Sequence, residues 1–192
     1  MEKFLAAKYP GAKRFGLEGG ESLVPLLDTV IEELGSKGAK ELVMGMSHRG
    51  RLNVLINVMG KKPSELFTEF DEDFEQDDAH TGDVKYHLGY SSNILTSGGQ
   101  VHVALGSNPS HLEVVNSVVL GSVRARQDRR QDSSMTKVVP ILMHGDASFS
   151  AQGIVMEILQ LSQTRAFGVG GTIHIVINLS LIHISEPTRQ EA

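Results

Sequence analysis

Short apolar runs alternate along the chain with segments in which apolar residues recur every three or four positions. The runs are typical of buried strands, and the spaced pattern is typical of amphipathic helices. One clear stripe follows Ser22, and Pro25 falls in its first turn, where the missing N–H costs no hydrogen bond. The predicted strands span residues 41–46, 101–105, 138–143 and 172–177. The predicted helices span residues 22–34, 51–59, 111–130 and 151–162.

The predicted elements follow one another as strand, helix, strand and helix. Near-continuous apolar strands in this order predict an α/β fold, a parallel sheet with helices on both faces. Right-handed crossovers bring the carboxyl ends of such strands to one edge of the sheet. The polar segments after the strands begin at His48, Asn108, His144 and Asn178, so we expect these residues to share that edge.

The domain organisation follows from the same pattern. Residues 1–21 are predicted to form an N-terminal segment of loop and short helix, and residues 22–178 an α/β domain. Residues 71–83 hold many acids and few apolar side chains, so they predict a mobile surface loop within that domain. No strand is predicted at the polar stretch Ser91–Asn93 or at the turn Gly98–Gly99 that follows it.

Composition narrows the class of protein. The chain has 192 residues, 40% of them hydrophobic and 21% charged, with a net charge of −5, which is typical of a globular domain with one sizeable core. This balance predicts no nucleic-acid surface, and the basic clusters Lys61–Lys62 and Arg124–Arg126 are interpreted as solvated helix surfaces. No apolar run approaches the length of a membrane span. Because Cys is absent and Met1–Phe4 lacks the apolar core of a secretory signal, we expect a cytoplasmic, bacterial protein.

Asp146 is the leading candidate for a metal ligand. Without Cys, a metal must be held by oxygen or imidazole ligands, and oxygen ligands favour a hard ion such as Mg²⁺. Gly145 allows the turn to approach a phosphate closely, and a carboxylate can complete a magnesium shell together with diphosphate oxygens. The same Gly-Asp pair also fits a plain helix N-cap, so spacing alone leaves both interpretations open.

Two other polar blocks follow predicted strands. His48 could bind a substrate carboxylate or carry a proton near neutral pH, and Arg49 offers a planar fork for phosphate. From spacing alone, a surface or structural role is the default interpretation of this pair. Ser110 follows Pro109 at a predicted helix start, where N-capping alone would explain it.

Taken together, these blocks resemble one family, the E1 components of 2-oxoglutarate dehydrogenase. The set is far more specific than any of its motifs, and the resemblance covers residues 1–178, which would form the first thiamine-binding region of a protein several times longer. The matching stretches are residues 14–20, 45–55, 82–89, 108–113 and 144–147.

The resemblance implies a thiamine diphosphate-binding fold, incomplete at its C-terminal end, and a role for each block. His48, His87 and Ser110 would bind and polarise the 2-oxo acid. Asp146 would be a ligand of Mg²⁺. The residues implied to hold thiamine diphosphate are Arg49, Ser110, Leu112, Asp146, Ala147 and Ser148.

The resemblance also implies a reaction and partners. The thiazolium carbanion attacks the keto carbon of 2-oxoglutarate, CO₂ leaves, and the succinyl group passes to the lipoyl arm of an E2 succinyltransferase. Family members are homodimers whose thiamine sites lie between two subunits, and the half that binds the aminopyrimidine comes from a later domain. We therefore expect residues 1–192 alone to be inactive.

The chain departs from the family pattern at its end. Leu179 stands where the family has an Asn ligand of the metal, and the backbone-carbonyl ligand falls at Leu181. Residues 179–189 match one reading frame of a transposase-end sequencing adapter, so we expect residues 179–192 to be a non-native tail. The alternative function left open is a non-catalytic α/β fragment that binds anions or another chain.

Overall fold

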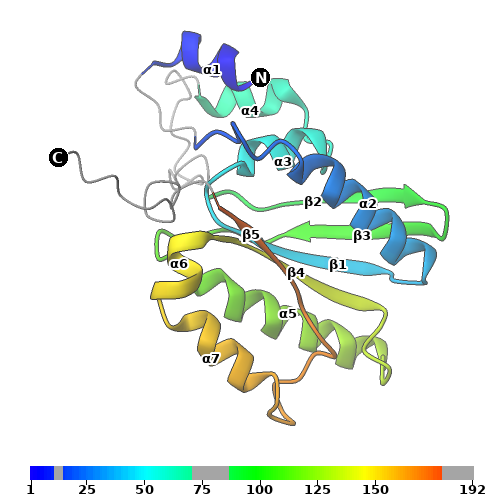
Figure 1. Ribbon diagram of the computed structural model, residues 1–192. Coiled ribbons are helices and arrows are strands. Elements are labelled where there is room, and N and C mark those ends of the chain that lie inside the picture. The colour runs from blue at the N-terminus through cyan, green and yellow to red at the C-terminus, as the bar shows by residue number, and fades with distance from the viewer. Residues whose placement is uncertain (11–14, 71–86, 179–192) are drawn as a thin grey trace, which may run out of the picture.

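A computed structural model describes residues 1–10, 15–70 and 87–178 (Figure 1). Its centre is a five-stranded sheet in the order β2-β3-β1-β4-β5. β1, β3, β4 and β5 run parallel, and β2 pairs antiparallel with β3 at one edge. The strands are β1 (Glu41–Met46), β2 (Tyr90–Thr96), β3 (Gly99–Leu105), β4 (Val138–Gly145) and β5 (Ile173–Ile177).

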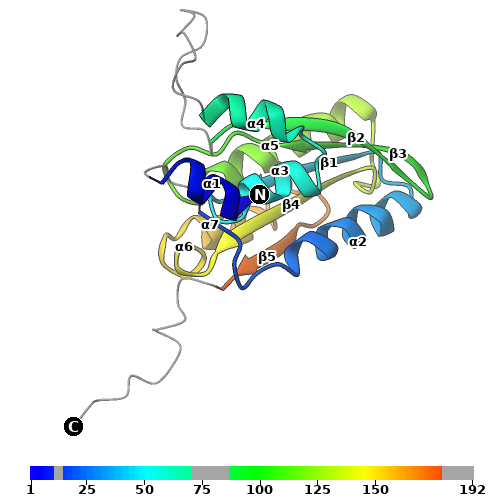
Figure 2. The same cartoon turned by 90° about the horizontal axis from the view of Figure 1, so that it is seen from above.

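Helices cover both faces of the sheet, which confirms the predicted α/β class (Figures 1 and 2). Successive side chains of β1 point to opposite faces: Leu42 and Met44 pack in one hydrophobic core and Val43 in the other. The first face carries α1 (Glu2–Lys8), α2 (Leu23–Ser36), α3 (Arg51–Asn57) and α4 (Pro63–Phe70). The second carries α5 (Val114–Arg130), α6 (Asp146–Ala151) and α7 (Ile154–Leu161).

The β2–β3 hairpin is a strand pairing that the sequence pattern did not predict. Every second residue of β2 is exposed, because one side of this edge strand faces solvent, so its sequence lacks an apolar run. The turn packs tightly on α2: a Cβ on Gly98 would lie 2.0 Å from the Gly35 carbonyl oxygen, and one on Gly35 would lie 2.3 Å from Thr96 Oγ1. Gly35 is therefore a packing residue inside α2.

Two helix boundaries differ from the prediction. α5 begins at Val114 and not at His111, because its N-cap Glu113 has a left-handed backbone with φ 69°. The helix predicted over 151–162 begins at Ile154 as α7, because its N-cap Gly153 has a left-handed backbone with φ 79°, and the separate short helix α6 before it was not predicted.

The basic clusters are less solvated than predicted. Lys61 is only 7% exposed and its ammonium lies 5.7 Å from the centre of the Tyr90 ring. Arg126 forms an ion pair with Glu41, as does Arg130. The interpretation of these clusters as solvated surfaces was therefore wrong for Lys61 and incomplete for Arg126.

Two predicted segments, the acidic loop at 71–83 and the tail at 179–192, lie outside the described residues. Among the helices that the structure describes, none has the length and apolar character needed to cross a membrane.

Candidate functional site

The carboxyl ends of the four parallel strands meet at one edge of the sheet, as the strand order predicted. One group of polar side chains lies on the segments that follow β1 and β3 and on the residues just before β2. Another group lies on the segment between β3 and α5, on β4 and β5, and at the start of α6. The backbone N–H of Ser47, just beyond β1, donates to the Met143 carbonyl of β4 at 3.2 Å, so the two groups are built on neighbouring strand ends.

The structure brings His48 and His87 together. Their Nε2 atoms lie 3.2 Å apart and their ring centres 5.3 Å apart, so one ring can donate a hydrogen bond to the other. His87 is 6% exposed and His48 is half-buried. We call these two residues the histidine pair. Burial, together with the nearby charges of His87 and Arg51, lowers the pKa of His48 below its ordinary value, which favours a neutral imidazole near pH 7.

The turn that presents His48 is held by the N-terminal segment. The Phe15 ring lies beside the His48 ring with centres 5.2 Å apart, and the Phe15 carbonyl accepts a hydrogen bond from the Gly50 N–H at 2.8 Å. Gly50 has φ 76°, and a Cβ there would lie 2.6 Å from Leu17 Cδ1. Both the backbone conformation and the packing of Leu17 therefore require glycine at this position.

The Arg51 side chain holds in place the backbone segments that carry the histidine pair. Its side chain is fully buried, and its guanidinium donates to the carbonyls of Met46 at 3.1 Å and of Leu88 and Gly106 at 2.6 Å each. Burial lowers the pKa of Arg51 to about 10, so the group keeps its charge at neutral pH. Arg51 thus ties the end of β1 to the end of β3 and to the segment that carries His87. The sequence placed Arg51 in a motif but gave no sign of this role.

Asn108 adds a buried donor to the same region. It is 2% exposed, and its backbone N–H donates to the His87 carbonyl at 2.8 Å. Within the described residues, the Asn108 amide nitrogen and the Ser47 hydroxyl are buried without a hydrogen-bond partner. Buried polar groups are usually paired, so these two atoms fit a site that is completed by a polar ligand.

The segment between β3 and α5 holds two further predicted residues. Ser110 is exposed and precedes α5 by several residues, so it does not cap that helix, and N-capping cannot account for it. Leu112 is 37% exposed, which is unusual for a leucine next to a buried helix start and leaves its side chain available for contact. Arg49 is half-buried at the start of the turn before α3.

Asp146 begins α6 directly after β4 and is 6% exposed. Gly145 pairs with Ile177 in the β4–β5 register, so Asp146 and Asn178 are each the first residue beyond that pair. A carboxylate and an amide therefore lie at corresponding ends of adjacent strands. Among the described residues, no cluster of three His, Cys, Asp or Glu side chains could hold a metal. The predicted departure at Leu179 lies outside the described residues.

Ala147 and Ser148 follow Asp146 in the first turn of α6. Ala147 is exposed, whereas Ser148 is 6% exposed. The Ser148 hydroxyl donates to Glu113 Oε1 at 2.5 Å and so does not face open solvent.

Glu113 is the centre of a buried polar network that the sequence did not predict. Besides Ser148, its carboxylate accepts hydrogen bonds from Asn116 Nδ2 and from His144 Nδ1, each at 2.6 Å. His144 is fully buried, and its Nε2 lies 2.9 Å from His174 Nδ1. We call Glu113, Asn116, His144, Ser148 and His174 the Glu113 network.

The hydrogen bonds of the Glu113 network determine which of its atoms carry protons. Burial raises the pKa of Glu113, but the bonds from His144, Ser148 and Asn116 outweigh it, and the net pKa is lowered. The ionised carboxylate can only accept, so Nδ1 of His144 must donate. For a neutral His144, Nε2 then accepts from His174. The pKa of His174 is lowered, mainly by burial and to a smaller extent by the nearby His144.

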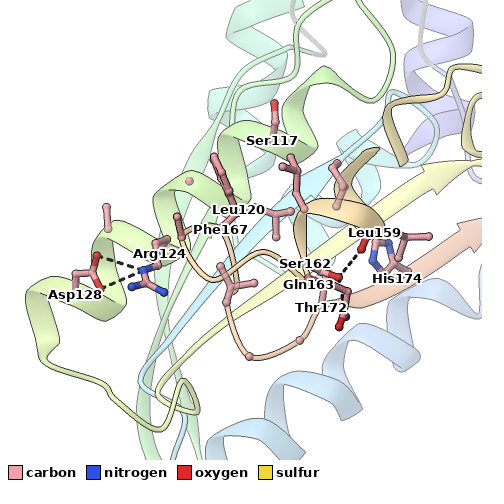
Figure 3. A pocket seen from close by; sticks show the side chains of 18 residues that line it. Ser117, Leu120, Arg124, Asp128, Leu159, Ser162, Gln163, Phe167, Thr172 and His174 are labelled. Atoms are coloured by element: carbon pink, nitrogen blue, oxygen red, sulfur yellow. Dashed lines mark hydrogen bonds and ion pairs between the residues drawn. The ribbon is translucent and has the colours of Figure 1, made fainter. Parts of the chain in front are cut away.

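A cavity of about 810 Å³ opens on the other side of His174 (Figure 3). It lies between α5, α7 and the residues that lead into β5, with Leu120, Leu159 and Phe167 among its apolar lining. Of the predicted site residues that the structure describes, none lines it. The cavity therefore does not coincide with the edge that carries the histidine pair.

Comparison with known proteins gives a consistent result. The family profile described as "Dehydrogenase E1 component" matches residues 1–188. A protein of Azotobacter vinelandii described as "2-oxoglutarate dehydrogenase E1 component" is 61% identical over 178 residues. Proteins of Cupriavidus necator and Haemophilus influenzae with the same description are 57% and 51% identical over the same length.

In each of these three comparisons the match covers 93% of this chain but 19% of the relative, so the chain spans about a fifth of the length of these relatives. The profile match takes in nearly the whole chain. It agrees with the parallel α/β sheet and its polar strand ends. The chain belongs to the dehydrogenase E1 component family.

Proposed function

We propose that this chain is the part of a 2-oxoglutarate dehydrogenase E1 component that binds the 2-oxo acid and the diphosphate end of thiamine diphosphate. The observation that carries the proposal is the histidine pair, with Nε2 atoms 3.2 Å apart at the carboxyl edge of a parallel sheet, where ligands bind in such folds. The similarity to 2-oxoglutarate dehydrogenase E1 components supports the choice of reaction.

The 2-oxo acid would bind at the histidine pair. A dicarboxylate with a keto group needs several donors. The imidazole N–H groups of His48 and His87 and the Asn108 amide, which is buried without a partner, would supply them. Arg51 would keep these donors in place because it fixes the backbone on which they stand. Exposed Ser110 would add a hydroxyl to the substrate or to the diphosphate.

The cofactor would lie along the same edge. Asp146 would supply a carboxylate to Mg²⁺, and its burial at a strand end fits a hard-ion ligand held close to diphosphate oxygens. Arg49, Ser110, Ala147 and Ser148 would contact the diphosphate, and Leu112 would pack against the rings. The resemblance assigns no second side-chain ligand within residues 1–178, because Leu179 stands at the position of the family's Asn ligand.

Each part of this edge would then have a distinct task in the reaction. Thiamine diphosphate, when bound, supplies the electron sink for loss of CO₂ from the 2-oxo acid. His48 and His87 orient the keto acid and can exchange a proton at Nε2. The buried walls around Arg51 and Asn108 limit the access of water. The succinyl group would pass to the lipoyl arm of an E2 partner, and the complete polypeptide would act as a homodimer.

Ligand-linked stability tests the cofactor part of the proposal. For a polypeptide of the relatives' length that contains residues 1–178, Mg²⁺ with thiamine diphosphate at about 100 times Kd should raise the free energy of unfolding by about 2.7 kcal/mol. The Asp146→Asn variant should lose most of that gain. An equal gain for the variant, or no gain in the unsubstituted polypeptide, would contradict the proposed site and favour a non-catalytic, anion-binding domain.

A further inference from the structure

Glu113 links the segment between β3 and α5 to the segment where β4 becomes α6. It stands at the N-terminus of α5, and two of its three partners, His144 and Ser148, belong to the segment where β4 becomes α6. Its backbone has φ 69°, a conformation that is costly for a residue with a side chain. The carboxylate is thus held in place at an energetic cost that the surrounding hydrogen bonds offset.

The two partners enclose the residues proposed to hold the cofactor. His144 directly precedes Gly145 and Asp146, and Ser148 directly follows Ala147. Both are bonded to the same carboxylate, His144 to Oε2 at 2.6 Å and Ser148 to Oε1 at 2.5 Å. The backbone of residues 145–147 is therefore tethered at both ends to one rigid group.

We propose that Glu113 is a positioning residue that fixes the 145–147 turn in the conformation that binds Mg²⁺ and thiamine diphosphate. Glu113 does so without touching the cofactor itself, because its two carboxylate oxygens are occupied by His144, Ser148 and Asn116. The inference rests on the proposed function. Groups that orient metal ligands in this way typically change metal affinity by about 10-fold to 100-fold when they are removed.

A role limited to stabilising the fold makes a different prediction. His144 and Asn116 are buried among strands and helices, so loss of Glu113 will destabilise the protein in either case. A purely structural network would weaken cofactor binding no more than any other core substitution of equal cost. Val119 offers the matched control, because it is 2% exposed on the same helix, α5, and packs in the core beneath.

The test compares Glu113→Gln and Val119→Ala in a polypeptide of the relatives' length that contains residues 1–178. The Kd of Mg²⁺ at saturating thiamine diphosphate is measured by calorimetry at a temperature where both variants are folded. Gln keeps the shape of the Glu side chain but replaces one accepting oxygen with an N–H₂ group. This group cannot accept a hydrogen bond from the partner that faces it. We expect Glu113→Gln to raise the Kd at least about 10-fold. Val119→Ala should stay within about twofold, as should the KM for 2-oxoglutarate in Glu113→Gln at saturating cofactor.

Three results would overturn the inference: an unchanged Kd in Glu113→Gln, an equal rise in Val119→Ala, or a KM that rises with the Kd. If Glu113→Gln does not fold, Asn116→Ala takes its place, because it removes only one bond to the carboxylate. Its Kd should rise about threefold to tenfold, and no rise would overturn the inference. Failure of the unsubstituted polypeptide to bind Mg²⁺ and thiamine diphosphate would instead contradict the proposed function, and the inference with it.

Discussion

The histidine pair and the Glu113 network occupy neighbouring strand ends of one sheet but differ in how far their polar groups are satisfied. Around the histidine pair, the Asn108 amide and the Ser47 hydroxyl are buried without a partner in the described part of the chain. In the Glu113 network the carboxylate accepts three hydrogen bonds. The first region has donors left for a ligand, whereas the second uses its donors to hold the backbone.

Burial alone therefore does not identify a binding residue. His87 and His144 are both nearly inaccessible, yet His87 faces another imidazole across 3.2 Å and His144 is bonded on both ring nitrogens. A ligand could bond to a member of the first pair after a small rotation. In the second region it would have to break a charge-assisted bond first.

The largest expected effect comes from Arg51, which carries the histidine pair. Arg51→Met should lower the free energy of unfolding by about 3–5 kcal/mol, because one buried and two partly buried carbonyls lose their donor at once. Denaturant unfolding of Arg51→Met and Arg129→Met measures the difference, since Arg129 is an exposed arginine on α5. Similar losses in the two variants would show that Arg51 is not the support of this region.

The next effect concerns the pair itself. His48→Ala and His87→Ala should each lower kcat/KM for 2-oxoglutarate by about 100-fold in a polypeptide of the relatives' length. Because the two rings act as a unit, the double variant should lose less than the product of the single losses. His102→Ala is the matched control, since His102 is a partly exposed histidine of β3 bonded to Asn93. Full activity in either single variant would remove the pair from the site.

Gly50 tests how tightly the turn before α3 must be held. Gly50→Ala should destabilise the protein by about 1–2 kcal/mol more than Gly60→Ala. Both residues have a left-handed backbone, with φ 76° and 74°, but a Cβ at Gly60 meets nothing within 4 Å, whereas at Gly50 it meets Leu17. Equal thermal stabilities for the two variants would mean that Leu17 moves aside without cost.

The smallest expected effect is a pH dependence of stability. The pKa values of His48 and His174 are lowered in the folded protein from 6.5, so the unfolded chain binds more protons once the pH falls below that value. Stability should therefore decrease from pH 7.5 toward pH 5.5. Lowered carboxylate pKa values, as for Glu113, act only in a more acidic window, below 4.5.

Chemical unfolding across that pH range, repeated with His48→Gln, separates the contributions. The variant should show a shallower decrease because one titrating ring is gone. An unchanged slope would mean that the pair does not contribute to the pH dependence.

The sequence predicted the parts of this fold that depend on local pattern. The four parallel strands are near-continuous apolar runs, and their order requires that His48, Asn108 and His144 share one edge. The pattern missed β2, because alternate residues of this edge strand face solvent. It also missed α6 and began the next helix at 151, because the left-handed backbone of Gly153 has no signature in hydrophobic spacing.

The sequence named the residues of the candidate site but not the residues that hold them in place. His48 and His87 are far apart in sequence, and only the resemblance placed them together before the fold did. Arg51 and Glu113 were part of recognised motifs, yet an arginine or a glutamate is usually exposed, so burial with three partners could not be foreseen from composition. A long-range contact such as the one between Glu113 and Ser148 depends on the packing of α5 against β4.

A comparison of two substrates tests most directly whether the histidine pair binds the 2-oxo acid. In a polypeptide of the relatives' length with bound Mg²⁺ and thiamine diphosphate, release of CO₂ is measured from 2-oxoglutarate and from pyruvate. We expect a kcat/KM at least about 100-fold higher for 2-oxoglutarate, and a much smaller ratio in His87→Ala, because the donors of the pair lose their second carboxylate partner in pyruvate. Equal values for the two acids, or an unchanged ratio in His87→Ala, would contradict it.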